Sequence, residues 1–388
     1  MIVELDGSHP LGKLTSTMAF PVLQHVPGQP HAMAFLQGAA DRPHHAYVFA
    51  GPEGSGKSLA ARAFAAALLC RQGGCGECRD CRLALKEQHP NEFIVEPEGR
   101  DIHVNTIREE VWTPVSRTAP ELGRKIFVIR EADRLSPAAA DTLLKVLEEP
   151  PADAVFLLMS ARAHELPETI RSRCHTVTFT ALSESFVVDV LESEGVDPTR
   201  AHLAARLTGG NLGRARRLAV ADDGLAFRDA AIEALELAER GPAEALEAAD
   251  RVVAAASGYK KAMKAELDQE LAPFLDEKGR PEDAYRGAIR RIEIRFQRRE
   301  RRAERDYVDW VLLAASALLR DRIAVQVGAV RHDLMNPDRQ PEDGFSAVRA
   351  SRGFAGVEAA RAELAEDLNL NTKLVLEGAF LCVAEIAD

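Results

Sequence analysis

The first part of the chain alternates between short apolar runs and longer stretches in which apolar residues recur at helical spacing. Runs of the first kind lie at residues 47–50, 92–97, 125–129, 154–160 and 175–179. The runs at 125–129 and 154–160 are almost continuously apolar, which is typical of strands buried in a parallel sheet, and the other three are expected to be strands as well. The pattern therefore predicts an α/β fold in which a parallel sheet is flanked by helices.

Beyond the last of these runs the strand pattern stops. Residues 182–237 have the pattern of helices joined by short loops, Gly241-Pro242 breaks it, and residues 243–256 form an alanine-rich stretch. Apolar residues from Val308 to Val327 recur near the helical period and indicate a core helix. The second part of the chain is therefore expected to be all-α.

One stretch of this helical part is strongly basic. Residues 286–305 carry nine arginines against three glutamates, with apolar residues between them. Such a helix can contact DNA phosphates or an acidic partner, and it can equally be the solvated face of a long helix. The solvated face is favoured because the stretch lacks a set of aromatic residues for stacking. Trp112, elsewhere in the chain, is expected in the core.

Composition limits the class of protein. The 388 residues are enough for two or three domains, and a net charge of −11 argues against a protein that wraps nucleic acid on its own. The N-terminus carries Glu4 and Asp6 and no basic region, so no secretory signal is expected. We expect a cytoplasmic protein without a membrane span, with residues 1–17 as a loose arm and Met18 as an alternative start.

A glycine-rich turn follows the first strand and opens into a helix. It fits the phosphate-binding pattern G-x-x-x-x-G-K-[ST]. The glycines let backbone N–H groups face phosphate oxygens, Lys57 would contact the β- and γ-phosphates, and Ser58 the magnesium ion. The candidate nucleotide-binding residues are Gly51, Gly54, Ser55, Gly56, Lys57, Ser58 and Leu59.

Four cysteines follow this helix within twelve residues: Cys70, Cys75, Cys78 and Cys81. Disulfides are rare in the cytosol, and zinc takes four thiolates at about 2.3 Å in a tetrahedron. The spacing C-x4-C-x2-C-x2-C lets one loop supply all four, so a closed structural zinc site is predicted. The alternative is four free cysteines in a loop. Cys174 and Cys382 are expected as buried thiols.

The residues after the strand at 125–129 depart from a working ATPase. Such a strand normally ends in an acid that holds magnesium, often followed by a glutamate that prepares the attacking water. Here Arg130 replaces the acid, Glu131 remains as a doubtful catalytic residue, and Asp133 comes two positions late and is expected to turn away. A cation at this place opposes magnesium binding, so hydrolysis by this chain alone is doubtful. The intact glycine-rich turn still allows ATP and Mg²⁺ as ligands.

Several of these motifs occur together in one known family. The glycine-rich turn, the four-cysteine insert, the run Leu143–Pro151 and Ser172-Arg173-Cys174 resemble the AAA+ subunits of the bacterial DNA polymerase III clamp loader over about residues 20–220. The resemblance implies that Arg173, with Glu168 as its nearest acid in sequence, is an arginine finger acting in trans on a neighbour's ATP. It also implies a polar sensor at Ser160 and a lid-domain sensor at Arg214, one residue later than in the motor subunits.

In these departures the chain resembles the delta-prime type of subunit. The resemblance implies a stator with weak or no ATPase activity and no polymerase site. The resemblance implies a hetero-oligomeric ring with motor subunits and the delta subunit, which loads the sliding clamp onto primer–template DNA. Two alternatives stay open: an ATP-hydrolysing gamma/tau-type motor subunit, and a zinc-stapled interaction protein outside replication. The expected domains are an AAA+ domain at 18–181 with a zinc module at 70–81, a helical lid at 182–242 and a helical collar at 243–388.

Overall fold

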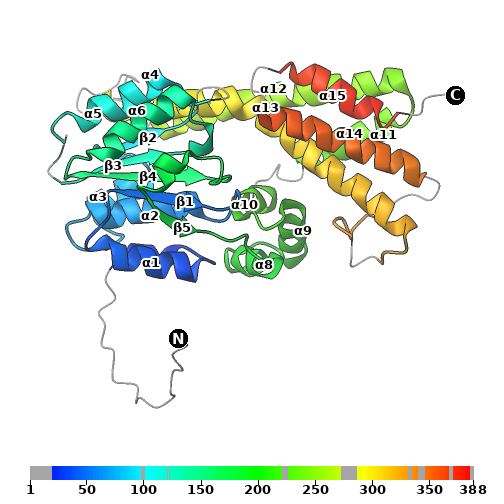
Figure 1. Ribbon diagram of the computed structural model, residues 1–388. Coiled ribbons are helices and arrows are strands. Elements are labelled where there is room, and N and C mark those ends of the chain that lie inside the picture. The colour runs from blue at the N-terminus through cyan, green and yellow to red at the C-terminus, as the bar shows by residue number, and fades with distance from the viewer. Residues whose placement is uncertain are drawn as a thin grey trace, which may run out of the picture.

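The computed structural model contains an α/β part, a group of three helices beside it, and a bundle of longer helices (Figure 1). It describes residues 20–97, 101–119, 121, 123–220, 226–271, 286–330, 334–339, 346–366 and 370–384. The expected arm at 1–17 and the alternative start at Met18 lie outside the described residues. Among the described helices, none is long and apolar enough to cross a membrane.

Five parallel strands form the sheet in the order β2-β3-β4-β1-β5, as the apolar runs predicted. The strands are β1 Ala46–Ala50, β2 Glu92–Val95, β3 Lys125–Ile129, β4 Ala154–Ser160 and β5 His175–Thr178. Strand β1 lies between β4 and β5; it pairs with β4 through Ala46 and Phe156 and with β5 through Tyr47 and His175. Its carboxyl end therefore lies between those of two neighbours.

Alternate residues of the strands face two separate cores. Tyr47 and Phe49 face one core and Ala46 and Val48 the other, as the period of two of a strand requires. The first core is covered by η1 Pro21–His25, α1 Pro30–Ala40, α2 Lys57–Leu69 and α3 Arg79–Leu85. The second is covered by α4 Val104–Ile107, η2 Arg108–Trp112, α5 Thr113–Val115, η3 Ala132–Arg134, α6 Pro137–Glu148 and α7 Glu168–Arg171.

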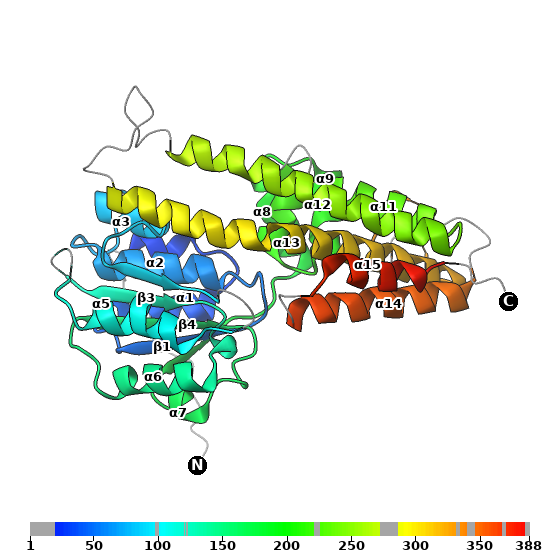
Figure 2. The same cartoon turned by 90° about the horizontal axis from the view of Figure 1, so that it is seen from above.

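The helical remainder forms two groups. The first contains α8 Glu184–Ser193, α9 Pro198–Thr208 and α10 Leu212–Val220. The second contains α11 Ala226–Ala238, α12 Pro242–Leu271, α13 Arg286–Gln326, α14 Ala347–Glu366 and α15 Thr372–Leu381. In both views α13 extends from this second group back toward the α/β part (Figure 2).

Helix α11 packs against α12 and α13, whereas α8, α9 and α10 pack with one another, and the lid at 182–242 and the collar at 243–388 stay predictions. Trp112 ends η2 with 44% of its surface exposed, so the expectation of a core residue was wrong. Residues 286–305 lie in α13 as expected, but most of their arginine side chains are outside what the structure describes.

Candidate functional site

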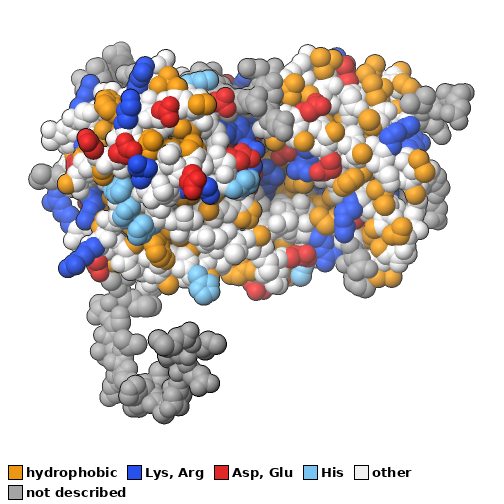
Figure 3. Space-filling model, viewed as in Figure 1, with side chains coloured by type: hydrophobic (Ala, Val, Ile, Leu, Met, Phe, Trp, Pro, Cys, Tyr) orange, Lys and Arg blue, Asp and Glu red, His pale blue; other side chains and the backbone are white. Residues whose placement is uncertain are grey.

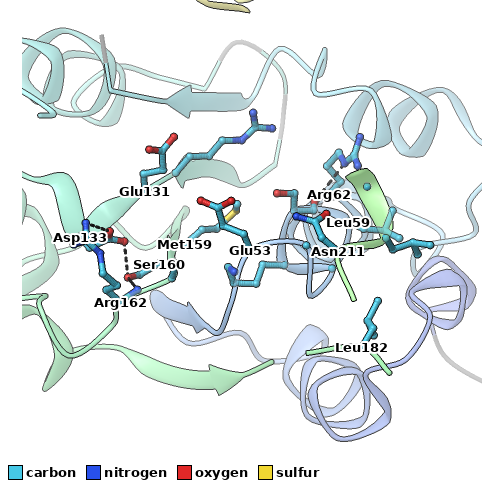
Figure 4. A pocket seen from close by; sticks show the side chains of 18 of the residues that line it. Glu53, Leu59, Arg62, Glu131, Asp133, Met159, Ser160, Arg162, Leu182 and Asn211 are labelled. Carbon is cyan, nitrogen blue, oxygen red and sulfur yellow. Dashed lines mark hydrogen bonds and ion pairs between the residues drawn. The ribbon is translucent and has the colours of Figure 1, made fainter. Parts of the chain in front are cut away.

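A cavity of about 770 Å³ opens where the carboxyl ends of β1, β3 and β4 meet (Figure 4). Ligands of α/β proteins bind at this edge of a sheet because the loops that follow the strands converge there. The walls come from the turn after β1, from the segments after β3 and β4, from the start of α10 and from α14. The space-filling view shows basic and acidic side chains together in the recess between the α/β part and the helices (Figure 3).

The turn between β1 and α2 has the backbone that its glycines predicted. Gly54 has φ of +75° and Gly56 of +92°, in the left-handed region that side chains disfavour. At Gly54 a Cβ atom would lie 2.1 Å from Cγ of Asn211, just before α10. The turn therefore needs glycine at this position for two reasons, its backbone angle and the close approach of the helical group.

Lys57 begins α2 on the floor of the cavity. Its Nζ donates to the carbonyl oxygens of Gly51, at 2.5 Å, and Pro52, at 2.6 Å. Burial lowers the pKa of Lys57, while the carboxylates of Glu53 and Asp133 oppose this shift. The ammonium group is thus held at the turn with two acids near it, which favours the charged form that binds a phosphate.

The segments after β3 and β4 form a polar wall of the cavity. Asp133 accepts a hydrogen bond from Ser160 Oγ at 2.6 Å, and its other oxygen lies 3.4 Å from Arg162 (Figure 4). Glu131 also lines the cavity, with φ of +49° and an ion pair to Arg134 at 3.1 Å. The expectation that Asp133 turns away was wrong, because its carboxylate lies beside Ser160 in this wall.

Arg130 lines the cavity where a magnesium-binding acid was expected. Its guanidinium donates to Glu87, after α3, and to Glu96, after β2. Burial alone would lower the pKa of Arg130, but the two carboxylates raise it above its ordinary value. The side chain therefore stays charged and is fixed by its two acidic partners.

The predicted lid arginine is at the edge of the site. The Arg214 guanidinium lies 3.4 Å from Glu53 and 3.2 Å from Asp309 of α13, and Arg214 is not among the residues that line the cavity. Arg216 lines it instead and pairs with Glu194 at 2.5 Å. Sequence reasoning missed Arg216, although it lies one helical turn after Leu212, another lining residue.

The cavity also has a wall from near the end of the chain. Ala362 and Ala365 of α14 line it, and Arg134 donates to the carbonyl oxygen of Ala365 at 3.0 Å. No motif in the sequence signalled this contact, because small apolar residues on a helix carry no chemical signature.

Arg173 lies away from this cavity, on the surface after α7. It donates to Glu148 Oε1 at 2.7 Å and to the Thr169 carbonyl at 2.8 Å. Its side chain is 36% exposed. The acid that holds it comes from the end of α6, and not from Glu168, the nearest acid in sequence.

The four cysteines of the insert converge. Their sulfur atoms all lie within 4.8 Å of one another, and Cys70 Sγ is 3.9 Å from that of Cys75 and 3.6 Å from that of Cys78. Four thiolates about 2.3 Å from one zinc ion would be about 3.8 Å apart, so the arrangement fits a tetrahedral site. Cys174 is buried as expected, whereas Cys382 is half-buried.

A second group near this cluster, Asp80, His89 and Glu121, does not fit a metal. The Asn91 N–H donates to His89 Nδ1 at 3.1 Å, so the proton of the neutral ring is on Nε2, which faces Asp80. Glu121 is held in a two-bond pair with Arg79 at 3.0 and 3.1 Å. These side chains anchor the cysteine loop to the start of β2.

The structure brings together most of the predicted nucleotide-binding residues, but not all. Those that line the cavity are Gly54, Gly56, Lys57, Ser58, Leu59, Glu131 and Ser160. Gly51 contributes its carbonyl to Lys57, and Ser55 is buried, with its hydroxyl donating to the Pro52 carbonyl at 2.8 Å. Arg173 and Arg214 lie outside the cavity lining.

Comparison with known proteins gives relatives of this architecture. Residues 28–183 match the family described as DNA polymerase III, delta subunit. The delta' subunit of DNA polymerase III from Bacillus subtilis is 36% identical over 188 residues, which cover 46% of this chain and 56% of that protein. The delta' subunit from Pseudomonas aeruginosa is 43% identical over 136 residues, 34% of this chain and 41% of that protein.

A relative of another subunit type matches the same chain. The DNA polymerase III subunit tau of Bacillus subtilis is 33% identical over 171 residues, 42% of this chain and 30% of that protein. This chain thus spans little more than half the length of the delta' relative from the same organism, and less of the other two. Over residues 28–183, which carry the glycine-rich turn and the parallel sheet, this chain is therefore similar to the DNA polymerase III clamp-loader subunits.

Proposed function

We propose that the chain is the stator, or delta-prime type, subunit of a clamp loader. It would join motor subunits and a delta subunit in a cytoplasmic ring that uses ATP to load a sliding clamp onto primed DNA. The relatives named delta' support this assignment. Polymerisation of DNA would belong to the larger assembly, and this chain would act by position.

The position of Arg173 carries the proposal. The guanidinium is exposed, lies outside the chain's own cavity and is oriented by Glu148 and the Thr169 carbonyl. An arginine that enters a neighbour's ATP site stabilises the charge on the transferred phosphoryl group. Arg173 is held in one orientation, is partly exposed and does not line the cavity of its own chain. These properties suit an arginine that acts on the ATP of a neighbouring subunit.

The chain's own cavity would bind a nucleotide and turn it over slowly or not at all. Lys57 and the backbone of the glycine-rich turn provide the phosphate site. Arg130 occupies the place of the metal-binding acid and is paired with Glu87 and Glu96. Without an acid there, a catalytic magnesium ion is poorly held.

The four cysteines would hold one structural zinc ion. They come from the end of α2, the loop after it and α3, and these four thiolates alone would complete a tetrahedral site. A bound ion would fix the insert against the first core by joining two helices that already pack together.

Replacement of Arg173 by alanine tests the proposal. In a ring assembled with its motor subunits, we expect Arg173→Ala to lower DNA-stimulated turnover at the adjoining site by about 10³-fold, with assembly intact. Arg171→Ala removes an exposed arginine two residues away and should leave the rate unchanged. An unchanged rate with Arg173→Ala would disprove the finger role, and lost assembly would make the residue structural.

A second candidate, the ATP-hydrolysing motor subunit, is favoured by the intact glycine-rich turn and the tau relative. Steady ATP turnover by the isolated chain, abolished by Lys57→Ala, would establish it over the stator. We expect no such turnover, because Arg130 replaces the acid after β3.

A further inference from the structure

The cavity at the glycine-rich turn has an unusual charge balance for a magnesium–nucleotide site. Its acidic lining residues are Glu53, Glu131 and Asp133. Its basic lining residues are Lys57, Arg62, Arg130, Arg134, Arg162 and Arg216. Cationic side chains thus outnumber anionic ones two to one among the described residues that line the cavity, and of these cations Arg130 and Arg216 are also paired with acids outside the lining, Glu87, Glu96 and Glu194.

Each acid in the lining is already engaged by a guanidinium. The carboxylate of Glu53 pairs with Arg214 at 3.4 Å, and that of Glu131 pairs with Arg134 at 3.1 Å. Asp133, whose side chain is 5% exposed, uses one oxygen for Ser160 and directs the other to Arg162. No carboxylate of the lining is therefore left without a hydrogen-bond or ion-pair partner.

Magnesium makes demands that these carboxylates do not meet, and Ser58, the predicted magnesium contact in the lining, is a neutral hydroxyl that adds no charge to hold the ion. The ion needs near-octahedral oxygen ligands at about 2.0–2.1 Å, usually one or two carboxylates beside the phosphates and water. To supply Asp133, the protein would have to separate its second carboxylate oxygen from Arg162, while Ser160 can keep its bond to the first. A metal ion would then also lie among the arginines of the lining, which repel it.

We propose that this pocket takes its nucleotide as the metal-free polyphosphate, whose charge is compensated by Lys57 and the surrounding arginines and not by magnesium. The inference rests on the nucleotide site proposed above. The ligand of that site would then be free ADP or ATP, and the protein would compete with magnesium ions in solution for this free nucleotide.

Calorimetric titration of the full chain with ADP and ATP, in millimolar Mg²⁺ and in EDTA, tests the proposal. We expect a Kd in EDTA equal to or lower than that in Mg²⁺, because the ion withdraws free nucleotide by mass action. A Kd raised about tenfold or more in EDTA would overturn the inference while leaving the nucleotide site in place. No binding in either buffer would overturn the nucleotide site itself, and the inference with it.

A variant tests the role given to Asp133. Arg162→Ala releases this carboxylate, and since the Arg162 side chain is 51% exposed the fold should persist. We expect the ratio of the Kd in EDTA to the Kd in Mg²⁺ to rise by about threefold to tenfold. Arg42→Ala removes the same charge from an exposed site before β1, at the far end of that strand, and should leave the ratio unchanged. An unmoved ratio in Arg162→Ala would overturn the claim that Arg162 withholds Asp133 from a metal.

Discussion

Glu92, at the start of β2, is a buried acid whose two carboxylate oxygens have no hydrogen-bond partner among the described residues. Burial raises the pKa of Glu92 well above its ordinary value, and nearby Glu87 adds to the shift, while Arg130 and Arg62 oppose it. The folded protein therefore holds a proton here that the unfolded chain releases above about pH 4.5. In this window the free energy of unfolding falls as pH rises, until Glu92 ionises in the fold as well.

We expect Glu92→Gln to flatten the fall of the melting temperature with pH and to raise that temperature at pH 7 to 8, because the amide has no proton to lose. Thermal unfolding followed by circular dichroism between pH 5 and 8 measures both effects. Glu109→Gln makes the same change at an exposed position and should leave the profile as it is. A Glu92→Gln profile that keeps the original slope would show that other groups cause it.

The cysteine insert is the element in which the proposed zinc ion would be most closely joined to the fold. Cys78 caps α3, and its sulfur accepts the Cys81 N–H at 3.4 Å, so ligand and helix start are the same residue. The Val22 N–H donates to the Gly74 carbonyl at 2.9 Å, which ties the loop to η1. Loss of the metal should therefore loosen α3 and the start of the described chain.

We expect about one zinc ion per chain in protein purified without chelator, and well under one in Cys78→Ser. The variant should lose more than about 4 kcal/mol of unfolding free energy, as removal of a structural metal does. Cys382→Ser, far from the cluster, should keep its zinc and its stability. Metal analysis and chemical unfolding measure both quantities, and equal zinc in the two variants would disprove the site.

At the level of elements, the sequence predicted the features that depend on residues close together in the chain. Apolar runs revealed all five strands, and the glycine spacing placed the turn before α2. Contacts between distant segments were not predictable, because they depend on how helices pack. The association of α11 with α12, the place of Arg216 and the wall from Ala362 belong to this class.

Across the whole molecule, ionic contacts connect the glycine-rich turn to the C-terminal helices. Arg214 bridges Glu53 of the turn and Asp309 of α13, and Asp309 accepts from Arg361 of α14 at 3.2 Å. Glu358 continues the path, with Arg361 at 3.0 Å and Ser316 at 2.6 Å. The chain of contacts passes from the cavity, where the Glu53 side chain is exposed, into the helical bundle through the half-buried side chains of Arg214 and Asp309.

A double-mutant cycle on Arg214→Ala and Asp309→Ala should give a coupling energy of about 1 kcal/mol, because both side chains are largely shielded from solvent. The exposed pair Arg251 and Glu247 on α12, at 2.7 Å, is the matched control and should give less than about 0.5 kcal/mol. Urea unfolding of each variant supplies the energies. Equal coupling in the two cycles would mean that the bridge does not join the parts.

The wall that α14 gives to the pocket has a kinetic consequence. Ala362 and Ala365 line the cavity in which we propose that a nucleotide binds. A neighbouring subunit that binds the C-terminal helices would hold this wall of the cavity in place without touching the ligand. The dissociation rate of a fluorescent nucleotide would then report ring assembly. We expect slow dissociation from the complex and fast dissociation from the isolated chain.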